Sequence, residues 1–294
     1  MINKEKYKII FSNLNIEIDN FDEFVKYVEI FSLKKIIVGY SFPFIDKKTG
    51  NFYPSTKSSE IVSFIKFDKE IAMYLLELIL FFEIKFKNLI VKMWKKNYKL
   101  EDTIIYNFSD ELLSSLIPNL ANCNDLNFVD FKYSLFEYST TSESLLEYST
   151  FTKIPIEDLA NSWTLATAIN FYRVLDEKIK MKILYKLNVD ESFFNIFHKM
   201  LNLILKVRNM ISHNHMIHNL SIKHYRLEFN KVYNSIFKNF HYNENSSISY
   251  MQVANIINYL LFVDFKNDSE IFLKKLNINP VSKEKLIRLL YGNL

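Results

Sequence analysis

Glycine, proline and cysteine are scarce in this chain of 294 residues, which holds 3 Gly, 5 Pro and 1 Cys. β-Rich folds need many tight turns, and glycine and proline supply most of them. The scarcity of both therefore favours long helices and few hairpins. The single cysteine, Cys123, excludes a disulfide within the chain and any zinc site built from several cysteines.

The sequence also lacks an apolar leader and an uninterrupted apolar span. Residues 1–6 hold no apolar core of the kind that a secretory signal needs, so we expect a cytoplasmic protein. The most apolar stretch, residues 71–91, is interrupted by glutamates and lysines that a bilayer would not tolerate, so we expect no membrane partner. The net charge of +4 permits an RNA partner, whose contact surface would have to be local.

Hydrophobic residues make up 49% of the chain and aromatic residues 16%, which is enough for a large core. We expect an all-α protein of three segments packed as one unit. Residues 1–60 are irregular in pattern, with a short helix over 22–31 and a small β-hairpin around the turn at 46–51. Residues 61–220 form a helical core, and residues 221–294 a C-terminal helical extension.

Apolar spacing predicts the main helices. A long helix is expected over 59–99, because apolar residues recur there three, four and seven positions apart. A second helix, starting near Asp190, carries a heptad-like apolar stripe that either packs within the chain or forms a dimer seam. Further helices are expected over residues 107–124, 155–175, 176–187, 221–240, 247–265 and 282–291, with a loop over 125–155.

Arg208 and His213 end the second of these helices, four residues apart from one another in the pattern Arg-x4-His. Arginine offers a permanent cation with a planar donor fork suited to phosphate, and histidine exchanges protons near neutral pH. Residues five apart on a helix differ by about 140° in azimuth and ~7.5 Å in height. Either the helix ends near Ser212, so that His213 turns back, or two protomers each supply one copy of the motif.

The motif resembles that of the Abi-like abortive-infection proteins, the AbiD and AbiF group of the HEPN superfamily. Arg208, Asn209, His213 and Asn219 match, whereas Asn214 and Met216 stand where relatives often carry His and Arg. The resemblance covers about residues 25–220. Its other parts are Gly39-Tyr40-x-x-Pro43-Phe44, Phe67-Asp68-Lys69-Glu70, Glu83 with Lys87, and Trp163-Thr164.

The resemblance implies a HEPN-type helical bundle that acts as a homodimeric, metal-independent endoribonuclease without a cofactor. Attack of the RNA 2′-OH on the adjacent phosphorus would leave a 2′,3′-cyclic phosphate and a 5′-OH, so DNA would not be cleaved. His213 would be the acid or base, Arg208 would stabilise the phosphoryl charge, and Asn209 would orient His213 or hold a phosphate oxygen. By family position, Glu83 is a candidate partner of Arg208 or His213. The implied role is that of an anti-phage effector or toxin, controlled in the AbiF-like branch by a small noncoding RNA.

Several alternatives stay open at this point. The motif residues could be an ordinary helix end, and the chain a non-catalytic RNA-binding or partner-binding protein of the same fold. His213, His215 and His218 could bind zinc in an irregular loop, although no carboxylate lies among them. A lysine stripe could follow RNA phosphates or simply be solvated. The candidate RNA-binding residues are Lys85, Lys92, Lys96, Lys99, Trp94, His215 and Asn219.

Overall fold

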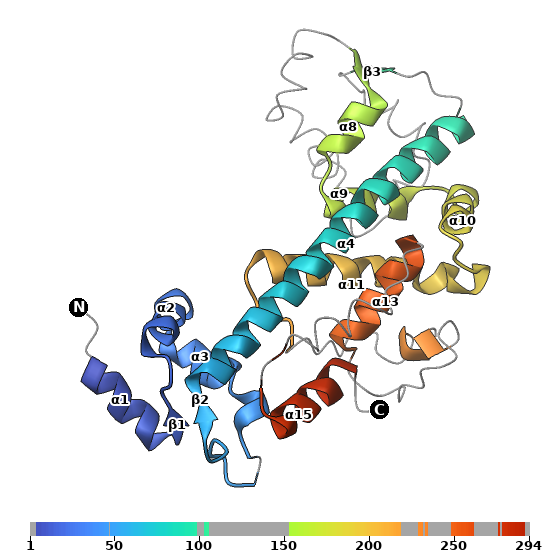
Figure 1. Cartoon of the computed structure of the whole chain (residues 1–294). Helices are drawn as coiled ribbons and strands as arrows, with labels where there is room; N and C mark the ends of the chain where they lie inside the picture. Colours follow the sequence, from blue (N-terminus) through green and yellow to red (C-terminus); the bar gives the residue numbers. More distant parts are fainter. Residues whose placement is uncertain are drawn as a thin grey trace. The chain divides into compact units, whose positions relative to one another are not determined.

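The computed structural model describes residues 4–46, 48–98, 103–105, 153–218, 229–231, 233–234, 248–261, 276 and 278–291. Helices dominate this part of the chain (Figure 1), so the all-α prediction is confirmed. Strands are limited to two short pairs. Ile16–Glu17 (β1) runs parallel to Thr56–Lys57 (β2), and Thr103–Ile105 (β3) runs antiparallel to Lys153–Pro155 (β4).

The chain forms two compact units. The first unit comprises Met1–Leu76, Met210–Asn255 and Asp264–Leu294, and the second comprises Glu77–Asn209 and Ile256–Val263. The first unit thus takes in parts of all three segments expected from the sequence, because contacts between distant parts of the chain, and not sequence order, define it. The helices Ser58–Tyr98 (α4) and Phe194–Ser212 (α11) each contribute to both units.

The 41-residue helix α4 is the longest element and matches the expected helix within one residue at each end. Its apolar residues recur along one face and are buried, including Phe64, Leu75, Phe82 and Phe86. The exposed face carries charged residues near both ends of the helix. This pattern is the amphipathic signal on which the prediction depended.

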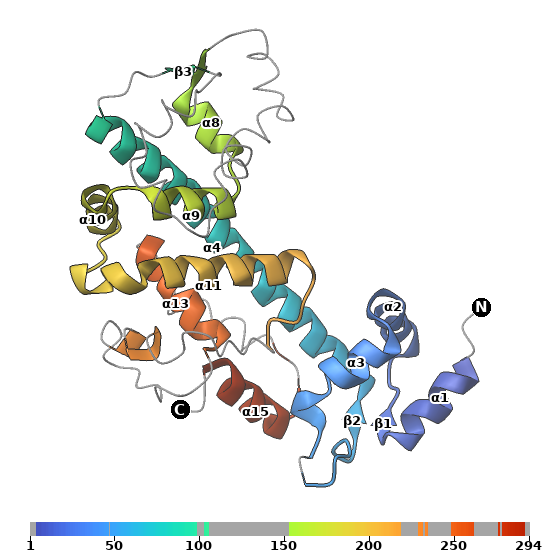
Figure 2. The same cartoon turned by 180° about the vertical axis from the view of Figure 1, so that it is seen from behind.

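The second unit is built around the C-terminal part of α4 by Ile156–Ser162 (α8), Leu165–Val174 (α9), Glu177–Lys186 (α10), the short turn Glu191–Phe193 (η4) and most of α11. Figure 2 shows α9 crossing α4. Aromatic contacts join these helices: Trp94 meets Phe171 at 4.8 Å between ring centroids, and Tyr172 meets Phe197 at 5.5 Å. The expected continuous helix over 155–175 is interrupted after Trp163, because Thr164 caps α9 by accepting a hydrogen bond from Thr167 N–H.

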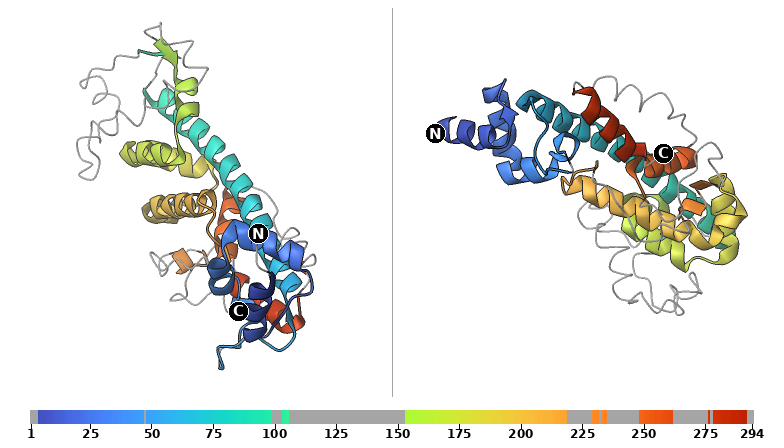
Figure 3. Two further views of the ribbon diagram at one scale, coloured as in Figure 1. Left: turned by 90° about the vertical axis from the view of Figure 1, so that its left-hand side faces the viewer. Right: turned by 90° about the horizontal axis from the view of Figure 1, so that it is seen from below.

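The first unit gathers Lys4–Asn13 (α1), Phe21–Phe31 (α2) and Leu33–Gly39 (α3) near the start of α4 (Figure 3). These residues were expected to be irregular apart from one short helix, so the structure corrects the prediction. Ser32 separates α2 from α3 at a positive φ of 66° and serves as the cap of both, which lets two short helices follow without a spacer. The expected hairpin is reduced to a single antiparallel bridge between Ile45 and Phe52.

Two C-terminal helices complete the described chain, Tyr250–Leu261 (α13) and Pro280–Tyr291 (α15). In the first unit, α15 is attached to the start of α4, because Asn279 N–H donates to Glu60 Oε1 at 2.7 Å. Its Lys285 donates to Ile45 O at 2.8 Å. The expected helix over 107–124 and the loop over 125–152 lie outside the described residues, as does most of the expected helix over 221–240. No helix in the described part of the chain is long and apolar enough to cross a membrane.

Candidate functional site

The heptad-like stripe of α11 is buried within the chain. Its members are Phe193, Phe197, Met200, Ile204, Val207 and Ile211, and none is more than 8% exposed. The stripe is therefore core packing, which settles the alternative in favour of contacts within the chain. This packing fixes the helix that carries Arg208.

Helix α11 ends one residue before His213 in a Schellman turn. Asn214 N–H donates to Ile211 O at 2.9 Å, and His215 N–H donates to Met210 O at 2.9 Å. Asn214 itself lies in the left-handed region with φ 56°, which asparagine adopts more readily than other residues with a Cβ. Of the two expected arrangements, the structure therefore shows the helix ending at Ser212.

This ending determines what is exposed. Arg208 is half-buried on α11 in the second unit, whereas Asn209 beside it is exposed. His213 and His215 belong to the first unit, where both are exposed on the turn. A histidine that exchanges protons with a substrate must be reachable from solvent, and His213 meets this condition.

His218, three residues beyond the turn, is by contrast buried in a polar network that sequence spacing did not reveal. Its Nδ1 lies 2.8 Å from Asp68 Oδ1, and its Nε2 lies 3.0 Å from Gly39 O. The backbone N–H of His218 also donates to Asp68 Oδ1, at 2.7 Å. Tyr40 Oη donates to the other oxygen, Asp68 Oδ2, at 3.1 Å. Three segments that carry the family resemblance thus meet in the core of the first unit.

Both ring nitrogens of His218 face oxygen atoms that accept hydrogen bonds. A carbonyl oxygen only accepts, so Nε2 must carry a proton, and the Asp68 carboxylate requires a proton on Nδ1 as well. An imidazolium paired with an ionised Asp68 satisfies both contacts. Burial, together with the negative charge of Asp68, holds the pKa of the Tyr40 phenol well above its usual range, so Tyr40 remains a donor.

Two lysines converge on the turn that carries the exposed histidines. Lys69 Nζ lies 2.6 Å from Asn214 Oδ1, and Lys35 Nζ lies 3.3 Å from Asn214 O. Both ammonium groups also lie over the Phe31 ring, at 5.3 and 5.6 Å from its centroid. Burial, and to a lesser degree the nearby charge of Lys35, lowers the pKa of Lys69 from its usual value, although Asp68 opposes the shift. Neither lysine was singled out from the sequence as an RNA-binding residue, because the chain separates them from Asn214 by 179 and 145 positions.

Glu83 lies in the second unit, where its Oε1 is 2.7 Å from Lys87 Nζ one turn along α4. Both side chains are nearly buried, at 10% and 8% exposure. The other oxygen, Oε2, is buried, and no hydrogen bond reaches it in the described structure. The contact that the structure shows for Glu83 is therefore with Lys87, and not with Arg208 or His213.

The expected lysine stripe of α4 is only partly available for RNA. Lys92 and Lys96 are exposed, but Lys85 Nζ donates to Leu260 O at 2.7 Å and is half-buried. Trp94 is 4% exposed and contacts Phe171, so its ring is not free to stack on a base. This burial corrects the expectation for Trp94, which arose because its place among lysines hid its place on the apolar face. Lys99 and Asn219 lie outside the described residues.

The three motif histidines do not form a joint metal site. His218 uses both ring nitrogens in the buried network, whereas His213 and His215 are exposed. Among all described residues, no group of three or more His, Cys, Asp or Glu side chains is arranged to hold a metal ion.

The family model described as "Abi-like protein" matches residues 23–219, more than half of the chain. The chain belongs to the Abi-like family. The match begins in α2 and ends just beyond His218, so it takes in Tyr40, Asp68 and the whole Arg-x4-His helix. No curated protein and no solved structure matches the chain. Membership of the Abi-like family connects this protein with abortive infection, and the finer function is argued from the residues above.

Proposed function

We propose that this Abi-like protein is a HEPN-type endoribonuclease that works without a metal or cofactor as an anti-phage effector or toxin. The observation that carries the proposal is the end of α11, where the Schellman turn exposes His213 five positions after the half-buried Arg208. A general acid or base and a phosphate-binding cation are the two groups that phosphodiester cleavage needs. The resemblance to HEPN nucleases supplies the reaction class.

In the proposed reaction, the RNA 2′-oxygen forms a bond to phosphorus while the bond from phosphorus to the 5′-oxygen breaks. The 2′-hydroxyl proton passes to a base, and a proton from an acid reaches the leaving 5′-oxygen, so that the products are a 2′,3′-cyclic phosphate and a 5′-OH. His213 takes one of these roles, and its copy in a second protomer takes the other. Arg208 stabilises the charge on the phosphoryl oxygens, and the exposed Asn209 holds a phosphate oxygen or orients His213.

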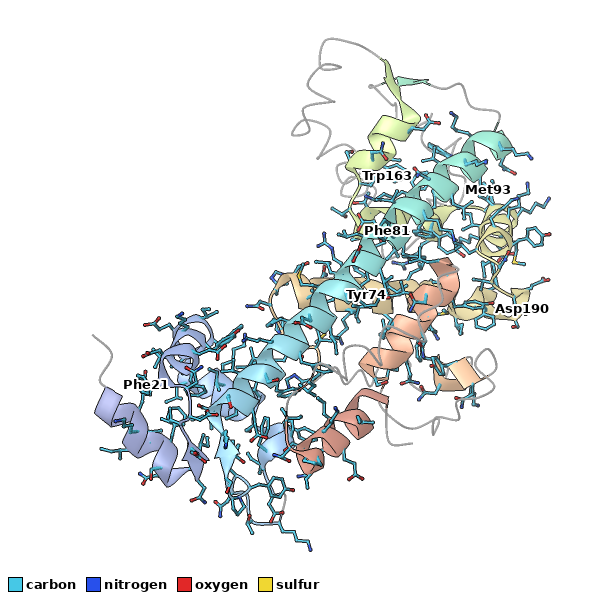
Figure 4. The ribbon with its side chains drawn as sticks, in the orientation of Figure 1. Phe21, Tyr74, Phe81, Met93, Trp163 and Asp190 are labelled. Atoms are coloured by element: carbon cyan, nitrogen blue, oxygen red, sulfur yellow. The ribbon has the colours of Figure 1, made fainter. Side chains whose placement is uncertain are left out.

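The proposed homodimer has a candidate surface on α4 in the second unit. Leu80, Phe81 and Ile84 are 44%, 57% and 57% exposed, although all three are large and apolar. Figure 4 labels Phe81 midway along α4. The exposed face begins with Glu77 and ends with Lys92, so an antiparallel two-fold pairing would place Glu77 opposite Lys92 of the partner subunit. A face with an apolar centre and ends of opposite charge is complementary to itself in that arrangement.

The deciding experiment is cleavage of RNA by purified wild-type protein and by His213→Ala. The wild type should cut RNA to 2′,3′-cyclic phosphate ends and leave a 2′-deoxy substrate intact, whereas His213→Ala should bind RNA and leave it uncut. His198→Gln, a change to another histidine of α11, serves as the matched control and should cleave normally. Cleavage by His213→Ala at the wild-type rate would overturn the assignment of His213.

A second candidate function is binding of RNA without cleavage. It is favoured by Asn214 and Met216, which stand where relatives often carry His and Arg. Purification from cells without nuclease treatment, followed by sequencing of the bound RNA, addresses the proposed control by a small noncoding RNA. One defined small RNA in stoichiometric amount would support an RNA-regulated effector, and the cleavage test would then use protein stripped of that RNA. A random mixture of RNA would remove the regulatory part of the proposal.

A further inference from the structure

The turn 213–215 is surrounded by more positive than negative charge in the first unit. Lys35 and Lys69 both contact Asn214, and Lys69 Nζ lies 4.0 Å from Asp68 Oδ2. Asp68 already accepts two hydrogen bonds from His218 and one from Tyr40. The carboxylate is therefore neutralised by the buried imidazolium, and the two lysines are left with an excess of positive charge.

Asn214 explains how these two cations stay close to one another. Its side-chain oxygen receives Lys69 and its backbone oxygen receives Lys35, so one residue holds both ammonium groups at the same turn. Both contacts are with neutral oxygen atoms, which do not cancel the charge. The Phe31 ring beneath both ammonium groups adds a cation–π attraction and also leaves their charge in place.

We propose that Lys35 and Lys69, held by Asn214 beside His213 and His215, form a binding site for an RNA phosphate. The proposal rests on the proposed function, since RNA is the ligand that it assigns to this turn. Two ammonium groups and two exposed histidines then surround one anion. The site supplies from α3 and α4 the positive charge that relatives carry at the positions of Asn214 and Met216. Asn214 thus has two roles, since it permits the left-handed turn and it positions the lysines.

The lowered pKa of Lys69 agrees with this reading. Burial and the charge of Lys35 both disfavour the protonated form, whereas a bound phosphate would favour it. An anion at the site would therefore relieve the repulsion between the two lysines. The salt dependence of RNA binding reports the number of such contacts, because each phosphate contact releases counterions.

The test uses a single-stranded RNA whose 2′-hydroxyls are methylated, so that it binds without being cut. Its dissociation constant is measured by fluorescence anisotropy over a series of KCl concentrations. Lys35→Gln/Lys69→Gln should flatten the plot of log Kd against log [KCl] by about 1.4, or about 0.7 for each lost contact on a single strand. Between 50 and 200 mM salt, the wild type should then lose about sevenfold more affinity than this variant.

Two control variants make the result specific. Lys178→Gln/Lys186→Gln removes the same charge from exposed positions of α10 and should keep the wild-type slope. Lys35→Arg/Lys69→Arg keeps the charge and should also keep the slope. An equal slope for the two glutamine double variants would overturn the proposal, and so would a wild type that does not bind this RNA.

A footprint on the wild-type protein gives an answer even if the glutamine variant does not fold. Bound RNA should slow acetylation of Lys35 and Lys69, measured by mass spectrometry, more than that of Lys178 and Lys186. Equal protection of all four lysines would contradict the site. Neither measurement depends on cleavage, so an enzyme claim that fails at His213 leaves this proposal standing or falling on its own.

Discussion

The side chains of His218 and Asp68 meet in the core of the first unit, with Nδ1 2.8 Å from Oδ1 and each side chain 1% exposed. Because Gly39 O faces the other ring nitrogen, the pair is an imidazolium and a carboxylate away from water. Such pairs are weak contributors to net stability, but breaking one by removing a single partner is costly. The pair links the segment that follows the catalytic turn to α3 and α4.

Replacement of Asp68 by alanine should therefore destabilise the protein strongly. It would leave a buried imidazolium, a backbone N–H and the Tyr40 hydroxyl without their acceptor, at a cost of about 3–5 kcal/mol in the free energy of unfolding. Urea denaturation of Asp68→Ala checks this, with Glu29→Ala, an exposed acid on α2, as the control. A loss below about 1 kcal/mol would be that of a surface position and would contradict the ion-paired network.

Tyr40 should make the protein sensitive to alkaline pH. Burial, then the charge of Asp68, raises the pKa of its phenol in the folded state, whereas an unfolded tyrosine ionises near pH 10. The folded state therefore holds one proton that the unfolded state loses, and stability falls by up to about 1.4 kcal/mol per pH unit above pH 10. Tyr40→Phe should show a shallower decline in urea titrations between pH 9 and 11. Tyr185→Phe, at a position 77% exposed, should decline as the wild type does.

The sequence predicted α4 almost to the residue because its amphipathic pattern extends over 41 residues, long enough to outweigh local preferences. It also located Arg208 and His213, since a motif is read along the chain. The short helices α1 and α3 escaped prediction, because helices of 10 and 7 residues depend on packing and on caps such as Ser32. The contacts of His218 with Asp68 and of Asn214 with Lys35 escaped as well. They join residues 150 and 179 positions apart, and no periodicity reports such distances.

Asn214 should tolerate glycine and reject a β-branched residue. Its φ of 56° lies in the left-handed region, where most side chains cost roughly 1–2 kcal/mol and glycine is not penalised. Thermal unfolding should thus place Asn214→Gly near the wild type and Asn214→Val clearly below it. Asn214→Gly also removes the oxygen that holds Lys69, so it should weaken RNA binding without a comparable loss of stability. Equal stability of the glycine and valine variants would contradict the left-handed turn.

The apolar face of α4 should control self-association. Phe81→Asp places a carboxylate at the centre of the proposed two-fold contact and should shift sedimentation from dimer to monomer, together with a loss of RNA cleavage. Tyr185→Asp, which makes the same change in charge at an exposed aromatic residue of α10, should remain dimeric. A Phe81→Asp protein that sediments as the wild type does would remove this face from consideration as the dimer surface.

Glu83 and Lys87 allow a structural role to be separated from a catalytic one. Lys87→Met alone leaves a buried carboxylate whose Oε2 already lacks a hydrogen bond, so it should lower the free energy of unfolding by about 3–5 kcal/mol. Glu83→Leu/Lys87→Met removes both charges and should restore most of that stability, because apolar packing often replaces a buried ion pair without loss. If Glu83 serves the fold alone, the double variant should also cleave RNA at a near-normal rate. A double variant that is stable yet inactive would instead place Glu83 in the reaction, as its position in the family suggested, and would show that its partner during catalysis is not Lys87.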